Sequence, residues 1–475
     1  MIATMVASTV VHWFGQPPAH WTVAPNRAVF REVGPRGFSE EPMLSVTIQG
    51  GVIEQSALLK DSSKKDQSNL DRSAYRLVEP GDLAYNKMRA WQGALGVSSH
   101  RGIVSPAYVI MRPRFDVDAN YYHYLFRTPA FAKEAERWSY GITSDQWSLR
   151  AEDFKQIYTL VPPLDEQRAI ARFLDRKSRR IARFIHARQR MIALLNEQKQ
   201  AIIHQAVTRG LDPDVPLKPS GIDWLGDIPA HWSRLPLSRV TLARCDGPFG
   251  SGLKSSHYTE SGVRVVRLQN IDTASYRHSS DAFISLAHYQ TLGDHDVYVG
   301  DLLIAGLGDE RHPCGRACVA PEGIEPAMVK ADCFRFRPDR SKIDSEFAAL
   351  QLSATAQAMS SVMSTGATRE RVNLQNMASR PMALPSLQEQ RWIVEHVAAA
   401  QAGFDEARLK QDREIELLRE YRTRLIADVV TGKLDIRDHP DSAEVAPDDL
   451  DDTEVLDTVI ADDEPDDDLV EEAPG

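Results

Sequence analysis

The sequence predicts an α+β protein, in which two mixed α/β domains are joined by two long antiparallel coiled-coil helices in a pseudo-twofold internal duplication. The first observation is that "WFGQPPAHW" at Trp13–Trp21 returns as "WLGDIPAHW" at Trp224–Trp232. The second is that "VPPLDEQRAI" at Val161–Ile170 returns as "LPSLQEQRWI" at Leu384–Ile393, and the offset of 223 then holds for about fifty residues. The 475 residues are enough for two or more domains, each with its own core.

Between these anchors, weaker repeats indicate a pair of related globular domains. "PGDLAY" at Pro80 matches "VGDLLI" at Val299, "IMRP" at Ile110 matches "RFRP" at Arg335, and "GITSDQWSL" at Gly141 matches "GATRERVNL". Their offsets drift, which is typical of loops that differ in length. Short segments such as "MLSVTIQGGVI", "AYVIMRP" and "VRVVRLQNI" are apolar and β-branched between Gly and Pro, and they predict strands.

Two long helices follow the globular domains. In the first helix, apolar residues recur at spacings of 7, 4, 7, 3 and 7, and the same positions of the second helix are apolar in five of six cases. Helices of roughly 65 Å with such an apolar stripe must bury it against another element, and we expect the two related helices to pack on each other. The seam positions are Leu174, Ile181, Ile185, Ile192, Leu195 and Ile202 in the first helix, and Val397, Phe404, Arg408, Ile415, Leu418 and Leu425 in the second.

Charge is distributed unevenly along the chain. Residues 438–475 hold 17 Asp or Glu and no Lys or Arg, so we expect a disordered acidic tail that serves as a solubiliser or as a mimic of nucleic acid. Without the tail, the chain has 56 basic and 50 acidic residues and is therefore slightly basic, whereas the whole chain has a net charge of −11. The first helix carries 11 basic and 4 acidic residues, an excess that favours a polyanion or an acidic partner. The densest cluster is Arg172, Arg176, Lys177, Arg179, Arg180, Arg183, Arg188 and Arg190.

The sequence shows no complete catalytic or cofactor motif. "GPFGSGLKS" is not a phosphate-binding loop, because Leu253 separates the last Gly from Lys254. His312, Cys314, Cys318 and Cys333 could ligate zinc, but one Cys-x3-Cys pair is a weak signal and buried reduced thiols are the alternative. We therefore expect a non-catalytic chain without metal or cofactor. No apolar run reaches membrane-spanning length, the N-terminus lacks a basic signal-peptide region, and four Cys suit a reducing cytoplasm.

The two "PPL-x-EQR"-type helix starts, the two "WLG-x-IP-x-HW"-type phrases and "DGPFGSGLKSSHYTESGVRVVRLQNI" together resemble the specificity subunit of type I restriction-modification systems. The resemblance covers the chain to about Asp438; the acidic tail and the missing Ser-Gly before Trp13 depart from the pattern. It implies two target-recognition domains that each read half of a split DNA target, with the helices as spacer. It also implies two modification subunits, which bind S-adenosylmethionine and methylate adenine, and restriction subunits that hydrolyse ATP, translocate and cut DNA.

The domain boundaries follow from the repeats. They are 1–163 for the first target-recognition domain, 164–210 for the first spacer helix, 211–386 for the linker and second domain, 387–437 for the second helix and 438–475 for the tail. We expect Trp21 and Trp232 to pack where the helices meet the domains. The alternatives to a DNA-reading scaffold are a DNA-modifying enzyme with an unrecognised site and a protein-interaction rod.

Polar residues in matched loops are the candidates for DNA contacts, although any single one could be an ordinary surface residue. The Gly-x-Thr loops come first, since small residues let the backbone approach DNA while polar ones reach bases or phosphates. These loops contribute Gly141, Thr143, Ser144 and Gln146 in the first domain, and Gly366, Thr368, Arg369 and Arg371 in the second. "YNKMRAWQG" adds Asn86, Lys87, Arg89 and Gln92, and "PFGSGLK" with "RLQN" adds Ser251, Lys254, Arg267, Gln269 and Asn270.

Overall fold

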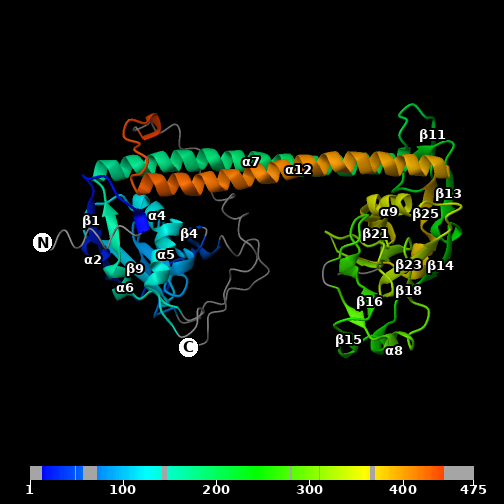
Figure 1. Cartoon of the computed structure of the whole chain (residues 1–475), viewed down its shortest axis with the longest axis horizontal. Helices are drawn as coiled ribbons and strands as arrows, with labels where there is room; N and C mark the ends of the chain where they lie inside the picture. Colours follow the sequence, from blue (N-terminus) through cyan, green and yellow to red (C-terminus); the bar gives the residue numbers. More distant parts are fainter. Residues whose placement is uncertain are drawn as a thin grey trace. The chain divides into compact units, whose positions relative to one another are not determined.

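The computed structural model describes residues 13–48, 50–56, 72–141, 147–278, 281–309, 311–363 and 370–442, so the acidic tail predicted beyond these lies almost wholly outside the described residues. Contacts divide the chain into two compact units (Figure 1). Unit 1 comprises Met1–Arg190 and Gln411–Gly475, and unit 2 comprises Met191–Lys410. Each unit therefore combines one globular domain with the start of the helix that follows it and the end of the other long helix.

Unit 1 is built around a four-stranded antiparallel sheet with the order β2-β9-β6-β7. Its strands are β2 (Phe30–Val33), β9 (Tyr108–Pro113), β6 (Leu83–Asn86) and β7 (Leu95–Val97). Three two-stranded pairs surround it: β1 (Thr22–Pro25) with β10 (Tyr158–Val161), β3 (Leu44–Thr47) with β4 (Gly51–Glu54), and β5 (Arg76–Val78) with β8 (Gly102–Val104).

Short helices cover this sheet and close an aromatic core. They are α2 (Asn26–Val29), η1 (Ala90–Gln92), α4 (Ala119–Phe126), α5 (Pro129–Arg137) and α6 (Ala151–Gln156). Side-chain oxygens cap two of them, because Asp118 accepts from Tyr121 N and Thr128 accepts from Phe131 N. The buried rings of Tyr122, Phe126 and Phe154 stack in the same core.

Unit 2 holds two larger sheets. The first has the order β14-β23-β19-β21, and the second has the order β15-β17-β16-β22-β18. The strands are β14 (Thr241–Cys245), β15 (Tyr258–Thr259), β16 (Val263–Val266), β17 (Phe283–Ile284), β18 (Asp296–Val297), β19 (Leu302–Ala305), β21 (Ala317–Val319), β22 (Ala327–Val329) and β23 (Cys333–Pro338).

The remaining elements of unit 2 connect these sheets. Paired strands are β11 (Leu217–Pro219) with β12 (Asp227–Pro229), β13 (Ser233–Pro236) with β25 (Pro381–Leu384), and β20 (Leu307–Gly308) with β24 (Glu370–Arg371). Helices are α8 (Leu286–Tyr289), α9 (Ser345–Ala354), α10 (Ala356–Met363) and α11 (Leu374–Ser379). Short 3-10 turns are η3 (Leu237–Arg239), η4 (Gly250–Gly252), η5 (Ser255–His257) and η6 (Leu268–Asn270) in unit 2, with η7 (Pro440–Ser442) in unit 1.

An ion pair between a buried Asp and a partly exposed Arg confirms that the two domains repeat one framework. In unit 1, Arg112 Nε and Nη2 donate to the two carboxylate oxygens of Asp82, each at 2.7 Å. In unit 2, Arg337 makes the same two bonds to Asp301, each at 3.0 Å. The Asp belongs to the repeated "GDL", and the Arg belongs to the "RP" that ends a strand in both domains. The matching phrases therefore mark structural positions rather than DNA contacts.

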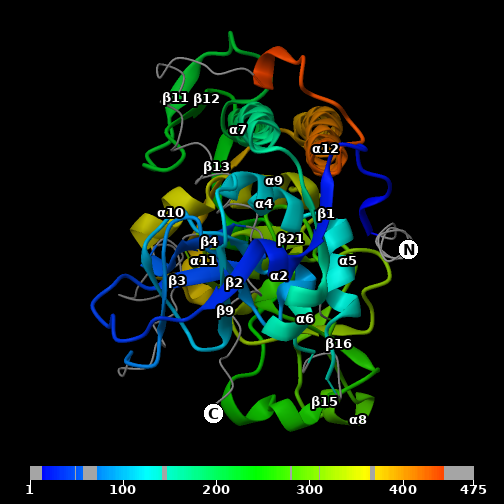
Figure 2. The ribbon, with the colours of Figure 1, turned by 90° about the vertical axis from the view of Figure 1, so that its left-hand side faces the viewer.

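The long helices α7 (Leu164–Arg209) and α12 (Leu387–Val430) run antiparallel and side by side within each unit (Figures 1 and 2). In unit 1, Arg188 bonds Gln411 at 3.2 Å and Glu414 at 3.0 Å, while earlier residues of α7 pack on later residues of α12. In unit 2, Lys199 bonds Asp405 at 2.9 Å. The predicted coiled-coil pairing is confirmed.

The burial of the predicted seam residues agrees with this pairing of the two helices. Leu174, Ile181, Ile185, Val397, Ile415 and Leu425 are buried, and Ile192, Leu195, Ile202, Phe404 and Leu418 are half-buried. Arg408, the one polar seam position, is exposed. Part of the basic cluster on α7 is neutralised inside unit 1, since Lys177 pairs with Asp441 at 2.7 Å as well as Arg188 with Glu414. No helix of the described chain combines the length and apolar character that crossing a membrane requires.

The repeated PAHW phrase packs against the ends of the long helices. His20 Nε2 lies 2.8 Å from Glu166 Oε2, and His231 Nε2 lies 3.0 Å from Glu389 Oε2, so the Glu of each "EQR" holds the His of each "PAHW". Trp232 is buried and donates to Glu389 Oε1 at 2.9 Å. Trp21 is buried as well, as predicted for a packing residue.

Candidate nucleic-acid interface

In unit 1 the first predicted segment forms a tight turn at the end of strand β6. Asn86 Oδ1 accepts a hydrogen bond from Met88 N at 3.0 Å, and Gly93, with φ of 100°, closes the turn before β7. The turn places Lys87 and Arg89 half-buried and Gln92 exposed. The amide of Asn86 therefore shapes the turn that presents the other residues.

The second predicted segment of unit 1 is attached to this turn. Leu149 N donates to Lys87 O at 2.8 Å, and the rings of Trp91 and Trp147 meet edge to face at 5.5 Å. Tyr140 bridges to Ser148, which places the two ends of the intervening loop together. Gly141 is exposed, whereas Thr143, Ser144 and Gln146 lie outside the described residues. The two segments that the sequence analysis selected separately thus form one surface.

Aromatic and cationic groups border this surface. Tyr140 is 49% exposed, and the guanidinium of Arg150 lies 4.7 Å from its ring centroid. Met88 is also exposed. Sequence reasoning did not select Tyr140 or Arg150, although an aromatic residue flanking a Gly-x-Thr loop is a usable signal, since exposed rings and guanidinium groups offer stacking faces to nucleic acid.

Unit 2 attaches its loop at the same strand position. Val372 N donates to Gly306 O at 2.9 Å, and Gly306 corresponds to Lys87 in the match of "VGDLLI" to "PGDLAY". The strands β20 and β24 then pair Leu307 with Arg371. Gly366, Thr368 and Arg369 lie outside the described residues.

Arg371 joins the two predicted segments of unit 2. Its guanidinium bonds Asp332 Oδ1, at 2.8 Å from Nη2 and 3.0 Å from Nε, and lies 6.0 Å from the ring centroid of Phe249. Phe249 is 54% exposed and belongs to "PFGSGLK". An exposed ring and a half-exposed arginine thus stand together, as Tyr140 and Arg150 do in unit 1.

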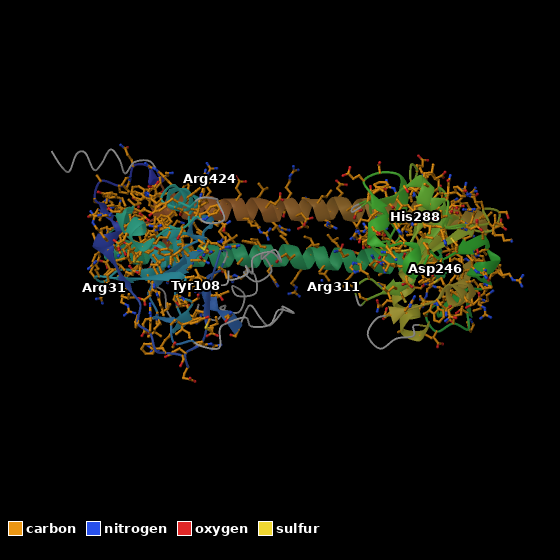
Figure 3. All side chains as sticks on the ribbon, turned by 90° about the horizontal axis from the view of Figure 1, so that it is seen from below. Arg31, Tyr108, Asp246, His288, Arg311 and Arg424 are labelled. Atoms are coloured by element: carbon orange, nitrogen blue, oxygen red, sulfur yellow. The ribbon has the colours of Figure 1, made fainter. Side chains whose placement is uncertain are left out.

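Two acidic residues lie beside Arg371. Asp246 Oδ1 accepts from Gly247 N at 2.7 Å and from Asp332 N at 3.0 Å. Burial raises the pKa of Asp246 to about 6, and the charge of Asp332 acts in the same direction. Figure 3 shows Asp246 and His288 within unit 2. These carboxyl groups hold the loop backbone and position Arg371 rather than contact an anion.

The last predicted segment of unit 2 divides into exposed and buried residues. Lys254 and Gln269 are exposed, and Arg267 is half-buried. Asn270 is 1% exposed; its Oδ1 accepts from Arg267 N at 2.9 Å and its Nδ2 donates to Arg277 O at 3.0 Å. The amide of Asn270 therefore closes the 3-10 turn η6, and a contact of this residue with DNA stays a prediction. The side chain of Ser251 lies outside the described residues.

The cysteines occupy packed positions. Cys314, Cys318 and Cys333 are buried, and Cys314 Sγ lies 3.2 Å from Ser360 Oγ. Burial raises the pKa of all three thiols, which opposes the thiolate form that zinc requires. Within the ranges that the structure describes, no three His, Cys, Asp or Glu side chains gather in a metal-binding group.

The structure thus combines a duplicated framework, polar and aromatic loops at matching strand ends, and two paired long helices. A family model described as "Type I restriction modification DNA specificity domain" matches residues 300–416. By this match and by its likeness to curated relatives, the chain is similar to the specificity subunits of type I restriction-modification systems.

Curated relatives and a solved structure show a similar likeness. The MjaVIII specificity subunit of Methanocaldococcus jannaschii is 23% identical over 285 residues, which span 60% of this chain and 64% of that protein. The putative MjaX specificity subunit of the same organism is 20% identical over 380 residues, 78% of this chain and 83% of the relative. A chain solved in a study of assembly and conformational transition of the type I R-M system has the same fold, with a TM-score of 0.63 at 15% identity, over 88% of this chain and all of that one.

Proposed function

We propose that this specificity subunit reads a bipartite, asymmetric DNA target, one half-site through the loops of unit 1 and the other through the loops of unit 2. The observation that carries the proposal is that one framework, with its matched Asp–Arg pairs, presents different loops at the same strand end. Lys87 in the turn after β6 has Gly306 as its counterpart after β19. Two readers that differ in their loops are expected to recognise different bases.

Within unit 1, the proposed contacts come from the surface that the turn and the Gly141 loop form together. Lys87, Arg89 and Gln92 can donate to phosphates or to acceptors at base edges, and Thr143, Ser144 and Gln146 are proposed from the sequence. Exposed rings such as Tyr140 add apolar contact area. Asn86 supports these residues from within the turn.

Within unit 2, we propose that Arg371 and Lys254 are the principal cations of the interface. Arg371 is already oriented by Asp332 and Phe249, so little side-chain freedom is lost when it binds. Arg267 and Gln269, at the start of the 3-10 turn η6 and within it, are proposed as further contacts. Ser251, Gly366, Thr368 and Arg369 are proposed from the sequence.

The long helices are proposed to dock the partner subunits, which are two modification subunits and the restriction subunits. Support comes from large apolar side chains that α7 and α12 leave exposed, because such groups on a helix surface are typical of protein interfaces. In unit 1 these are Phe184, Leu417 and Tyr421, and in unit 2 they are Met191, Leu194, Trp392 and Leu409. The enzymatic steps then belong to the partners, and the site of action is proposed to be cytoplasmic.

A domain exchange tests the two-reader proposal. Residues 22–160 are replaced by those of a relative with a different target, and methylation by the assembled methyltransferase is mapped by sequencing. We expect one half-site to change and the other half-site and the gap to stay the same. The reciprocal exchange of residues 233–383 serves as the matched control and should change only the other half-site. If either exchange alters both half-sites, the two units do not read independently.

A further inference from the structure

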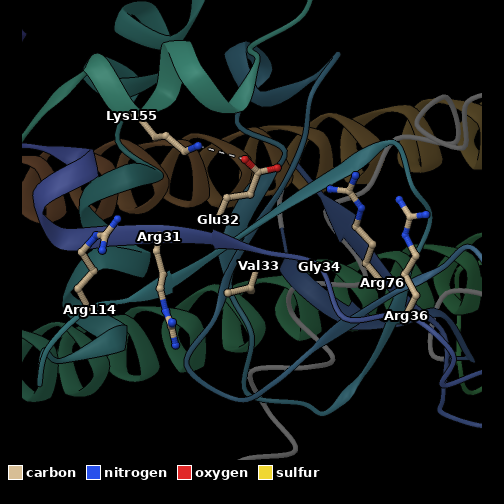
Figure 4. A pocket seen from close by; sticks show the side chains of 8 residues that line it. All are labelled: Arg31, Glu32, Val33, Gly34, Arg36, Arg76, Arg114 and Lys155. Carbon is tan, nitrogen blue, oxygen red and sulfur yellow. Dashed lines mark hydrogen bonds and ion pairs between the residues drawn. The ribbon is translucent and has the colours of Figure 1, made fainter.

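Unit 1 contains an open concavity of about 530 Å³ at the edge strand β2, and its lining includes none of the residues predicted from the loops. Figure 4 shows its lining, with Arg36 and Arg76 on one side of Glu32 and Lys155, and Arg31 and Arg114 on the other. The lining residues are Arg31, Glu32, Val33, Gly34, Arg36, Arg76, Arg114 and Lys155. Five of the eight are basic, and one is acidic.

The single carboxylate does not neutralise the arginines. Glu32 pairs with Lys155 at 3.2 Å, and Lys155 also pairs with Glu152 at 2.6 Å. Among the residues that the structure describes, Arg31, Arg36, Arg76 and Arg114 form no ion pair. Four guanidinium groups around one concavity repel each other, and an anion would relieve that repulsion.

Two of the arginines are held in place by backbone carbonyl groups. Arg114 Nε donates to Arg27 O at 2.9 Å and to Phe30 O at 3.0 Å, and Arg76 Nη1 donates to Tyr108 O at 3.2 Å. A guanidinium has five N–H donors, so each of these groups keeps further donors for a ligand. Anchored arginines of this kind suit the planar, two-point recognition of a phosphate.

Unit 2 repeats the backbone at this place but has no arginine at the positions of Arg31 and Arg114. Arg114 N donates to Val29 O at 2.8 Å, and its counterpart Asp339 N donates to Val240 O at 2.9 Å. Arg31 stands opposite Arg112 in its sheet, whereas Ala243 stands opposite Arg337. The framework therefore folds without an arginine at either of these positions, so the fold alone does not account for Arg31 and Arg114.

We propose that this concavity binds a backbone phosphate of the DNA strand that flanks the half-site read by unit 1. The inference rests on the proposed function. Two connections link the concavity to the proposed reading surface. Lys155 lies on α6, which begins directly after Arg150, and Tyr108, whose carbonyl holds Arg76, pairs with Asn86 in the sheet. A DNA strand that leaves the reading surface along this edge meets the arginines.

The test uses the assembled methyltransferase and measures its affinity for target DNA across salt concentrations. The variants are Arg31→Gln and Arg114→Gln, with Arg31→Lys as a charge-preserving control and Arg424→Gln as a control on α12, where Figure 3 labels an exposed arginine of the same unit. Each lost phosphate contact lowers the slope of log K against log salt by about 0.9, which corresponds to about fivefold in affinity at 0.15 M salt.

The expected result is a lower slope in both Gln variants, near wild-type behaviour in Arg31→Lys and Arg424→Gln, and unchanged discrimination between target and mismatched DNA. Wild-type affinity and slope in both Gln variants overturn the phosphate site but leave the proposed function standing. Tighter DNA binding in the Gln variants also overturns it, since that result means that a competing anion of the protein occupies the concavity. Failure of the wild-type complex to select any target refutes the proposed function itself.

Discussion

Replacing Gln390 tests why the "EQR" phrase occurs twice. Gln390 is fully buried at the start of α12. Its Nε2 donates to Pro385 O at 3.0 Å and to Lys342 O at 3.2 Å, and its Oε1 accepts from Asp344 N at 2.8 Å. Asp344 in turn caps α9 by accepting from Glu346 N and Phe347 N. The amide thus ties the long helix to the first turn of α9.

The magnitude follows from these three hydrogen bonds. Each is worth about 1 kcal/mol net, and an alanine leaves buried backbone groups without partners, so Gln390→Ala should cost unit 2 about 3 kcal/mol. Gln390→Glu keeps the acceptor for Asp344 N but sets a carboxylate against two carbonyl oxygens, and we expect a cost at least as large. Gln167 makes the matching bonds in unit 1, to Pro162 O at 2.8 Å and from Asp118 N at 3.0 Å.

Amide hydrogen exchange is the suitable assay, because a chain with two units need not unfold in one step. Protection of the Phe347 amide should fall by about a hundredfold in Gln390→Ala, whereas the Tyr121 amide of unit 1 keeps its protection. Arg391→Ala, at the exposed neighbouring position, is the matched control and should change neither. Wild-type protection at Phe347 in Gln390→Ala would show that the amide is not needed, and that the repeated Gln has another reason.

Two further predictions concern the loops and the core. Arg371→Ala should weaken DNA binding by the assembled methyltransferase by about 1–3 kcal/mol, more than Arg413→Ala on exposed α12, and equal affinities would remove the loop from the interface. Burial lowers the pKa of His123 to about 3, with the charge of Arg127 acting in the same direction. Folding therefore favours the neutral imidazole ring of His123. The stability that this preference gives unit 1 is complete above pH 6.5 and is lost as the pH falls below that value. Between pH 6.5 and 5 unit 1 should lose about 2 kcal/mol that His123→Gln does not lose, and parallel pH profiles of the two proteins would contradict this.

The repeats predicted the fold because framework contacts leave a regular trace in the sequence. The seam of α7 and α12 shows as spacings of three, four and seven, and Asp82 and Asp301 stand in the same phrase because each must meet a strand arginine. Such contacts join residue types that cannot be exchanged freely. The unbroken offset of 223 also predicted the pairing of the helices, since two equal stripes of that length cover each other.

The site could be predicted only in part. The matched loops were found from their Gly-x-Thr phrases, but the bond from Leu149 to Lys87 joins residues 62 positions apart and has no local pattern. Asn270 was selected because an Asn that closes a turn and an Asn that faces DNA look the same in a sequence. The arginines of the concavity are scattered from Arg31 to Arg114, so only the fold assembles them.

The division between framework and loops has a physical basis in where each hydrogen bond goes. The glutamines of the "EQR" phrases bind backbone groups, and the Asp of each Asp–Arg pair binds its Arg within the same unit. The energies of these contacts therefore do not depend on the loop side chains. The loops attach through backbone bonds, Leu149 N to Lys87 O and Val372 N to Gly306 O, which any residue except proline at the donor position can supply. Changing the reading residues therefore leaves the framework contacts intact, and one scaffold can hold Lys87 at a strand end in unit 1 and Gly306 at the matching position in unit 2. A phosphate site present in unit 1 alone fits the same logic, because exposed charge at a strand edge can be gained or lost without disturbing the buried pairs beneath it.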